Sequence, residues 1–239
     1  MINLDALKSV QERIEVARAL ANREHEPPVQ IVAITKTFPA SAIESAHRAG
    51  IKNIGENRIQ ESSQKFPHLP DLPQLKKRLV GHLQSNKASK AIKLFDAIDS
   101  IGSLKLAHRL SMLMAEPHSN YESLLQVNTG QDSAKHGFHP EKIETLLEAL
   151  ELKNLGIKGL MTIGEFTSDE RTIRKTFQKL RQLKERLNKH LSEESQLTEL
   201  SMGMSSDYEM AVEEGATMVR IGTAPVSYTH LTLPTTPYV

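Results

Sequence analysis

Residues 197–223, LTELSMGMSSDYEMAVEEGATMVRIGT, place two short apolar runs on either side of a segment with helical composition. The runs LTELSMG and ATMVRIG have the length of buried strands, and DYEMAVEEG between them suits a short helix. Two neighbouring parallel strands need a crossover connection, which is normally a helix. This stretch therefore predicts one strand–helix–strand unit of a parallel sheet.

The same alternation runs through the rest of the chain. Segments with helical spacing or composition separate six earlier apolar runs: VQIVAIT, IKNIG, RLVGHLQ, FDAIDSIG, YESLLQVNTG and IKGLMTIG. Eight such strands favour an α/β fold, a single closed (β/α)8 TIM barrel, over an open doubly wound sheet. The open sheet is the weaker alternative because ITKTFPAS, after the first run, lacks the glycine-rich turn typical of dinucleotide-binding sheets.

Two helices are indicated most clearly by their apolar spacing. An extra helix before the barrel is predicted by apolar residues at three- and four-residue steps, Leu7, Val10, Ile14 and Ala17. A second helix is expected to start after an N-cap at Ser168, with Asp169 and Glu170 in its first turn. Its buried stripe is predicted to be Ile173, Phe177, Leu180, Leu183, Leu187 and Leu191.

The composition limits the possible partners. The 239 residues are enough for one large domain with a full core. Thirty Lys and Arg against 29 Asp and Glu leave a formal charge of +1, which gives no reason to expect nucleic-acid or membrane partners. The absence of cysteine excludes disulfides and thiolate chemistry. With charged residues in the first helix and no apolar leader, we expect a cytoplasmic protein, and we expect it to be a monomer.

The C-terminal residues differ from the rest of the chain. PVSYTHLTLPTTPYV, residues 225–239, is uncharged, is rich in threonine and proline, and has no helical stripe. A barrel's eighth strand is normally followed by a closing helix. We therefore predict a barrel domain over residues 1–224 and interpret residues 225–239 as an atypical tail that resembles translated vector sequence. We also expect the first and eighth strands to lose apolar cover.

Lys36 lies in the stretch AITKTFP, residues 33–39, directly after the first predicted strand. Functional groups of a barrel lie where strands end and the following loops begin. A lysine that leaves a strand into a concave rim can be desolvated and supply the neutral amine that attacks an aldehyde. The alternative is a lysine that extends into solvent, which position alone favours.

A candidate anion site follows the last two predicted strands. Ser205 and Ser206 precede a helix start, where hydroxyl and backbone N–H groups can meet an anion. Gly222 and Thr223 follow the next strand and add a close backbone approach and a hydroxyl. Phosphate sites recur at this place in barrels, and ordinary helix capping is the alternative. Arg220 is expected to face the barrel mouth or interior, or to form a buried structural ion pair.

Other polar residues have ordinary local explanations. Asn57, in IGENRIQE, is interpreted as a capping residue at a strand-to-helix junction. His82 is interpreted as a satisfied core histidine rather than a base. His136 and His139 stand three residues apart without a third ligand at metal-binding spacing, so no metal site is predicted.

Taken in order, these stretches resemble the YggS/PROSC family of pyridoxal 5′-phosphate (PLP)-binding proteins, the PLP homeostasis proteins. The matching segments span roughly residues 5–224: IVAITKTFP, GENRIQE, GHLQSNK, QVNTGQDSAKHGF, GLMTIG and LSMGMSSDYEMAVEEGATMVRIGTA. The last segment is highly specific, because serine, arginine, glycine and threonine stand at fixed separations.

The resemblance implies a single barrel like the N-terminal domain of alanine racemase, with PLP as its cofactor. It also implies the cofactor-binding residues: Lys36 as the Schiff-base lysine, Asn57 beside the ring, Arg220 at the pyridine nitrogen, and Ser205, Gly222 and Thr223 around the phosphate. No residue is assigned a catalytic role.

The function implied by the resemblance is intracellular PLP homeostasis, that is, binding, buffering and delivery to apo PLP-dependent enzymes without robust catalysis. A cationic Arg220 weakens the electron sink of the ring. Racemase relatives add a tyrosine from a second domain, whereas only Tyr121 and Tyr208 precede the tail here. Many family members carry a second lysine where this chain has Phe38, which places handover of the cofactor in question. The alternatives are a PLP-dependent amino-acid racemase and a sugar-phosphate aldolase that uses Lys36.

Overall fold

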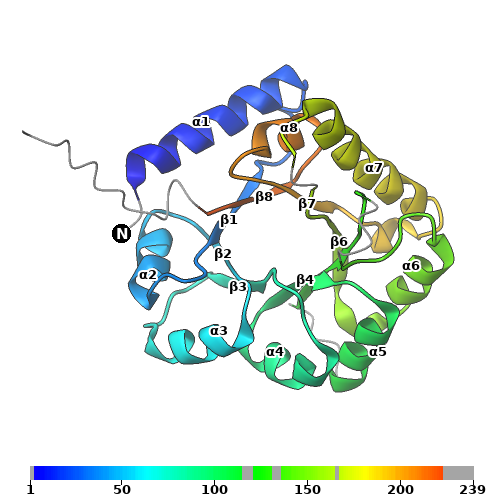
Figure 1. The fold of residues 1–239 in the computed structure, drawn as a ribbon, viewed down its shortest axis with the longest axis horizontal. Coiled ribbons are helices and arrows are strands. Elements are labelled where there is room, and N and C mark those ends of the chain that lie inside the picture. The colour runs from blue at the N-terminus through cyan, green and yellow to red at the C-terminus, as the bar shows by residue number, and fades with distance from the viewer. Residues whose placement is uncertain (1–2, 115–120, 131–135, 165–166, 223–239) are drawn as a thin grey trace, which may run out of the picture.

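Eight parallel strands form a closed barrel in chain order, with the helices around its outside (Figure 1). The computed structural model describes residues 3–114, 121–130, 136–164 and 167–222. The strands are β1 (Gln30–Ile34), β2 (Asn53–Glu56), β3 (Lys76–Leu79), β4 (Ala97–Ile101), β5 (Glu122–Gln126), β6 (Ile157–Met161), β7 (Glu199–Met204) and β8 (Met218–Ile221). β1 pairs with both β2 and β8, which closes the barrel and confirms the predicted fold.

The helices alternate with the strands as predicted. They are α1 (Leu4–Leu20), α2 (Ala40–Arg48), α3 (Ile59–Lys65), α4 (Ala88–Leu94), α5 (Leu104–Leu113), α6 (Ile143–Leu150), α7 (Glu170–Asn188) and α8 (Tyr208–Glu213). Short 3-10 turns cover Phe66–His68, Ser85–Lys87, Lys153–Leu155 and Glu193–Ser195. None of the helices in the described part of the chain is both long enough and apolar enough to span a membrane.

The N-terminal helix α1 covers the seam between the first and last strands. Its predicted stripe is buried, and Asn3 caps the helix by accepting a hydrogen bond from the Ala6 N–H at 3.0 Å. α1 lies along the outside of the barrel beside β1, β8 and α8 (Figure 1). Val219 and Ile221 of β8 are fully buried. Helix α1 therefore supplies apolar cover to part of this seam, while Ile31 of β1 is only partly buried. The expected loss of cover in the absence of a closing helix stays a prediction. The predicted tail, residues 225–239, lies outside the described residues.

Helix α7 begins one residue later than the sequence pattern indicates. Its N-cap is Asp169, whose side chain accepts a hydrogen bond from the Thr172 N–H at 3.1 Å, so the cap predicted at Ser168 is wrong. A carboxylate satisfies a free N–H and also interacts favourably with the helix dipole. The predicted stripe is buried within the helix, and Leu191, beyond its end, is partly buried.

The third strand is shorter than the apolar run RLVGHLQ suggests. β3 ends at Leu79, and the chain then turns toward the end of β2. A β-carbon on Gly81 would lie 2.1 Å from the Asn57 carbonyl oxygen, so only glycine fits at this crossing. The chain segments after β2 and β3 therefore lie in contact at the C-terminal rim of the barrel.

The barrel interior contains a charged cluster. Arg78 on β3 is 1% exposed and donates from Nε and Nη2 to Asp99 on β4, at 2.9–3.1 Å. Its Nη1 also donates to Asn53 of β2 and Glu122 of β5, at 3.3 and 3.2 Å. Because the four residues come from consecutive strands, their side chains meet inside the barrel. Such a pair carries a large desolvation cost and depends on the partner carboxylate.

We expect Asp99→Asn to lower the free energy of unfolding by about 3–5 kcal/mol, because the buried Arg78 guanidinium then loses its buried carboxylate and keeps only the partly exposed Glu122 as an ionic partner. Urea denaturation at neutral pH measures this change. Glu12→Gln is the control, since it breaks only the exposed Lys8–Glu12 pair and should change stability little. Equal effects of the two substitutions would contradict an essential role for the buried pair.

Candidate functional site

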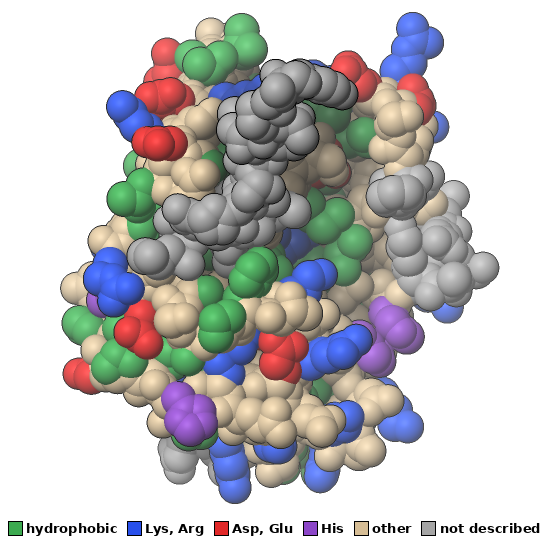
Figure 2. Space-filling model, turned by 60° about the vertical axis from the view of Figure 1, so that its left-hand side comes forward, with side chains coloured by type: hydrophobic (Ala, Val, Ile, Leu, Met, Phe, Trp, Pro, Cys, Tyr) green, Lys and Arg blue, Asp and Glu red, His purple; other side chains and the backbone are tan. Residues whose placement is uncertain are grey.

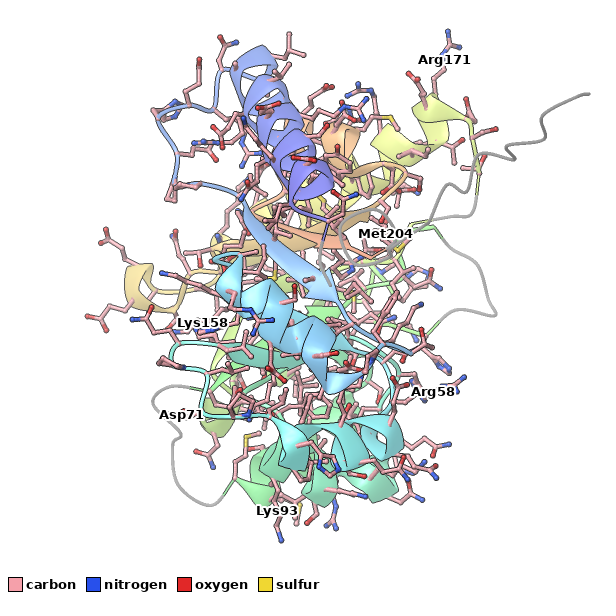
Figure 3. All side chains as sticks on the ribbon, turned by 90° about the vertical axis from the view of Figure 1, so that its left-hand side faces the viewer. Arg58, Asp71, Lys93, Lys158, Arg171 and Met204 are labelled. Atoms are coloured by element: carbon pink, nitrogen blue, oxygen red, sulfur yellow. The ribbon has the colours of Figure 1, made fainter. Side chains whose placement is uncertain are left out.

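A cavity of about 570 Å³ lies at the C-terminal rim of the barrel. Residues at or after the ends of β1, β2, β3, β6, β7 and β8 line it: Ile34, Lys36, Asn57, Val80, Gly81, Ile163, Met204, Ser205, Ser206, Arg220 and Gly222. Met204 lies on the same side of the barrel as Arg58, whereas Lys158, near the start of β6, lies on the opposite side (Figure 3). The cavity is thus at the face where barrel proteins carry their functional sites.

Five of the six residues assigned to the site from the sequence line this one cavity. They are Lys36, Asn57, Ser205, Arg220 and Gly222. Thr223, the sixth, lies outside the described residues. The strand ends therefore bring together side chains from both ends of the chain, as the barrel prediction requires.

Lys36 occupies a tight turn directly after β1. The Thr35 N–H still donates to Gly55 of β2 at 3.0 Å, and the Phe38 N–H closes the turn on the Thr35 carbonyl at 3.1 Å. Between them, Thr37 has a φ of 66°, a conformation that β-branched residues rarely adopt. Pro39 then forms the N-cap position of α2. The turn leaves the Lys36 side chain exposed at the cavity.

Ser205 and Gly222 approach each other across the ends of β7 and β8. The Gly222 N–H donates to the Ser205 hydroxyl at 3.1 Å. A hydroxyl and a backbone N–H at this spacing form a small group of donors that suits a phosphate or a carboxylate. The structure thus brings two residues of the predicted anion site together.

Two residues shape the turn that presents Ser205. Gly203 has a φ of +90°, and a β-carbon there would lie 2.5 Å from that of Ala211, so α8 can pack closely only on glycine. Asp207 accepts a hydrogen bond from the Met204 N–H at 2.5 Å. Burial raises the pKa of Asp207, which this hydrogen bond and the charge of Arg220 partly oppose.

Arg220 is buried beneath the cavity and is held by neutral partners. Its Nη1 donates to the Ser201 carbonyl and hydroxyl at 2.8 Å, and its Nη2 donates to the Thr162 carbonyl at 2.7 Å. These are not the carboxylates that a structural ion pair requires, and Arg220 lines the cavity at the mouth of the barrel while it is buried in the barrel interior. Burial lowers the pKa of Arg220 to about 10, with Asp99 and Asp207 opposing this shift. The guanidinium is therefore still cationic at neutral pH.

Asn57 is a cavity residue rather than a helix cap. Helix α3 begins at Ile59 after an N-cap position at Arg58, and no side chain caps it. The Asn57 side-chain oxygen is buried and has no hydrogen-bond partner within the described residues. The capping interpretation is wrong, because the close crossing at Gly81, not the start of the helix, fixes this residue. A buried polar atom beside the cavity is available to a ligand.

His82 also differs from its sequence interpretation. It is exposed, not a core histidine, and its ring stacks on that of His136 with the centroids 3.7 Å apart. Partial burial and the neighbouring His136 lower the pKa of His82. The folded protein therefore takes up this proton less readily than the unfolded chain. This lowered pKa stabilises the folded protein at pH values above the ordinary histidine pKa. The stabilisation is lost as the pH falls through the lowered pKa of His82.

Sequence reasoning missed an ionic cluster beneath the Lys36 turn. Glu56, at the end of β2, is fully buried and lies 2.7 Å from the Lys65 ammonium, which also contacts Glu61 at 3.1 Å. The only sequence signal was the four-residue spacing of Glu61 and Lys65, which commonly indicates an exposed helix pair. Burial of Lys65 depends on contacts with the neighbouring strands β1 and β2, so the sequence around Lys65 alone could not predict it.

Comparison with known proteins agrees with this architecture. The family described as alanine racemase, N-terminal domain, matches residues 2–229, which defines the class of barrel. A pyridoxal phosphate homeostasis protein of Pseudomonas aeruginosa is 40% identical, with 91% of this chain and 92% of the relative covered. One of Aquifex aeolicus is 37% identical, with 92% and 95% covered. The chain belongs to the family of pyridoxal phosphate homeostasis proteins.

A solved structure supports the same assignment. PipY of Synechococcus elongatus, in its form with PLP bound, is 38% identical to this chain. The two superpose with a TM-score of 0.76, covering 89% of this chain and 100% of PipY. The resemblance stated from the sequence is therefore confirmed.

We expect His136→Gln to raise the pKa of His82 toward its ordinary value, because the ring loses both its cover and its titratable neighbour. NMR titration of the ring protons measures this shift. His139→Gln alters a nearby exposed histidine outside the stack and should leave the His82 curve unchanged. A His82 curve that is the same in wild type and His136→Gln would refute the coupling.

Proposed function

We propose that this chain binds PLP in the rim cavity, holds it through the Lys36 amine, and acts in intracellular PLP homeostasis. The observation that carries the proposal is the convergence of the exposed Lys36, the Ser205–Gly222 pair and the buried cationic Arg220 on one cavity. The homeostasis proteins of the family and the PLP-bound PipY support the choice of cofactor. When bound, PLP supplies an aldehyde for Schiff-base formation with lysine and an electron-withdrawing ring.

The residues of the cavity fit the parts of this cofactor. We assign the phosphate to the Ser205 hydroxyl and the Gly222 N–H, and their mutual hydrogen bond supports this because it keeps the two groups next to each other. Thr223, which follows Gly222, is proposed to add its hydroxyl. Gly222 carries no side chain into this space; a β-carbon there would meet Ile34 only at ordinary contact distance, 3.5 Å. Asn57, whose buried oxygen has no hydrogen-bond partner among the residues that the structure describes, is assigned to the edge of the ring.

Arg220 supports a carrier rather than a catalyst. Its three hydrogen bonds fix the guanidinium beneath the cavity, where it is cationic. A fixed positive charge at the pyridine nitrogen opposes protonation of that nitrogen and weakens the ring as an electron sink. We infer that catalysis of carbanion chemistry is weak in this protein.

The positions of the tyrosines point the same way. Tyr121 is buried just before β5, at the opposite end of the barrel from the cavity. Tyr208 is buried at the start of α8. Neither is among the described residues that line the cavity. The tyrosine acid–base partner used by racemases thus has no counterpart among these residues.

We propose that the protein buffers PLP and delivers it to apo PLP-dependent enzymes in the cytoplasm, as a monomer with neither a nucleic-acid nor a membrane partner. The formal charge of +1 supports the part of this proposal that concerns nucleic acid and membranes, and acidic and basic side chains are both scattered over the face in Figure 2. We further propose that residues 1–224 form the PLP-binding domain and that residues 225–239 are a foreign tail. Phe38 packs on the apolar cluster of α2, so delivery here does not use a second lysine at that position.

We expect Lys36→Ala to abolish borohydride trapping of PLP, because the reacting amine is removed. The absorption spectrum of protein incubated with PLP, followed by reduction and mass mapping, makes the measurement. Lys87→Ala changes another exposed lysine near the same rim and should trap the cofactor as wild type does. Trapping at a different lysine would reject the assignment.

Rapid α-proton exchange with amino acids would favour the racemase, and aldol cleavage without bound PLP would favour the aldolase.

We expect Ser205→Ala to weaken PLP binding about tenfold, the scale of one hydrogen bond to a charged group. Pyridoxal, which lacks the phosphate, should bind the variant as well as it binds wild type. Equilibrium titration with both compounds tests the difference. If both affinities fall equally, Ser205 does not act on the phosphate.

A further inference from the structure

The Lys65 ammonium is buried behind the Lys36 turn and uses three oxygen acceptors. It donates to Glu56 Oε1 at 2.7 Å, to the Thr35 carbonyl at 2.9 Å and to Glu61 Oε1 at 3.1 Å. Thr35 adds a second link, because its hydroxyl donates to the same Glu56 oxygen at 2.7 Å. The side chains of Lys65 and Glu56 are 6% and 0% exposed. Helix α3 is thereby joined to the ends of β1 and β2 by buried, charge-assisted hydrogen bonds.

The same cluster holds the other side of the turn. Glu61 Oε1 accepts a hydrogen bond from the Thr37 N–H at 2.5 Å. Thr37 is the residue with a φ of 66°, which a threonine adopts only when its surroundings impose it. Glu61 supplies that constraint. Strained backbone of this kind tends to occur at functional sites.

The contacts fix the main chain on both sides of Lys36 and leave its side chain unrestrained. The residue before it is held at its carbonyl by Lys65, and the residue after it is held at its N–H by Glu61. None of the three charged residues of the cluster is among the described residues lining the cavity. They therefore act on the cavity only through the backbone of the turn.

We propose that Lys65, Glu56 and Glu61 form a clamp that positions the Lys36 turn so that its amine faces the cofactor. The three are positioning residues, and this role rests on the proposed function. A purely structural ion cluster is the competing explanation. The two explanations predict different PLP dissociation rates for a variant that loses the contact on one side of the turn but keeps the buried Lys65–Glu56 pair.

Glu61→Ala makes this distinction, because Lys65 keeps Glu56 and the Thr35 carbonyl as partners. We expect the Thr37 amide to exchange with solvent roughly tenfold faster or more, and PLP to dissociate faster by a similar factor. Glu61→Gln retains an oxygen acceptor and should restore most of both properties. Gln60→Ala, at the exposed neighbouring position of α3, is the matched control. NMR amide exchange and the decay of the cofactor absorption band provide the readouts.

A second variant tests the other side of the turn. Lys65→Met combined with Glu56→Gln removes the ammonium without leaving a buried carboxylate unpaired, so the fold is expected to survive. We expect faster PLP dissociation than in wild type. The clamp would be overturned if Glu61→Ala showed the same Thr37 amide exchange rate and PLP dissociation rate as wild type. It would also be overturned if the folded double variant retained PLP as well as wild type does.

Failure of the proposed function gives a different pattern of results. If wild type takes up no PLP on Lys36, the carrier assignment fails, while Thr37 exchange measured without cofactor still decides whether Glu61 holds the turn. If wild type binds PLP and Glu61→Ala changes neither exchange nor dissociation, the carrier assignment stands and the clamp is rejected.

Discussion

The pairing of β1 with β8 is the constraint on which the cavity depends. Val32 lies opposite Arg220 and Ala33 lies opposite Ile221, so the first and last strands run in register. All strands of a parallel barrel end at one rim. Lys36 and Gly222, which are separated by most of the chain, therefore reach the same cavity a few residues beyond this pairing. A shift of register would separate the amine from the anion-binding groups.

The residues that sequence reasoning placed correctly are those whose location follows from strand ends alone. Lys36 and Ser205 each follow an apolar run, and the barrel then determines where they lie. The local pattern around Asn57 favoured a cap, which was wrong, because a cap and a cavity residue look alike at a strand-to-helix junction; only the resemblance assigned Asn57 to the site, and the close approach of Gly81 explains its position. Lys65 was missed for a related reason: helical spacing predicts a pair with Glu61, but burial comes from β1 and β2.

Two buried arginines show how surroundings determine the role of one residue type. Arg78 faces the carboxylates of Asp99 and Glu122, which neutralise it, so it belongs to the internal structure of the barrel. Arg220 is held by carbonyl and hydroxyl groups, which orient and solvate a cation without cancelling its charge. Its positive potential therefore extends into the cavity. Both residues lie on strands of the same sheet, and their partners alone separate structure from function.

Helix α1 has a consequence for how the chain becomes folded. Much of its apolar stripe packs beside α8 and β8, the last elements of the described chain, although α1 lies before β1 in the sequence. Contacts of such long sequence separation form late, since nearly the whole chain must be ordered before they can. Leu7 packs with β1 and α2, whereas Val10, Ile14 and Ala17 belong to the cluster that includes α8 and β8. We therefore expect α1 to complete its docking late in folding, so that a folding intermediate exposes part of this apolar stripe.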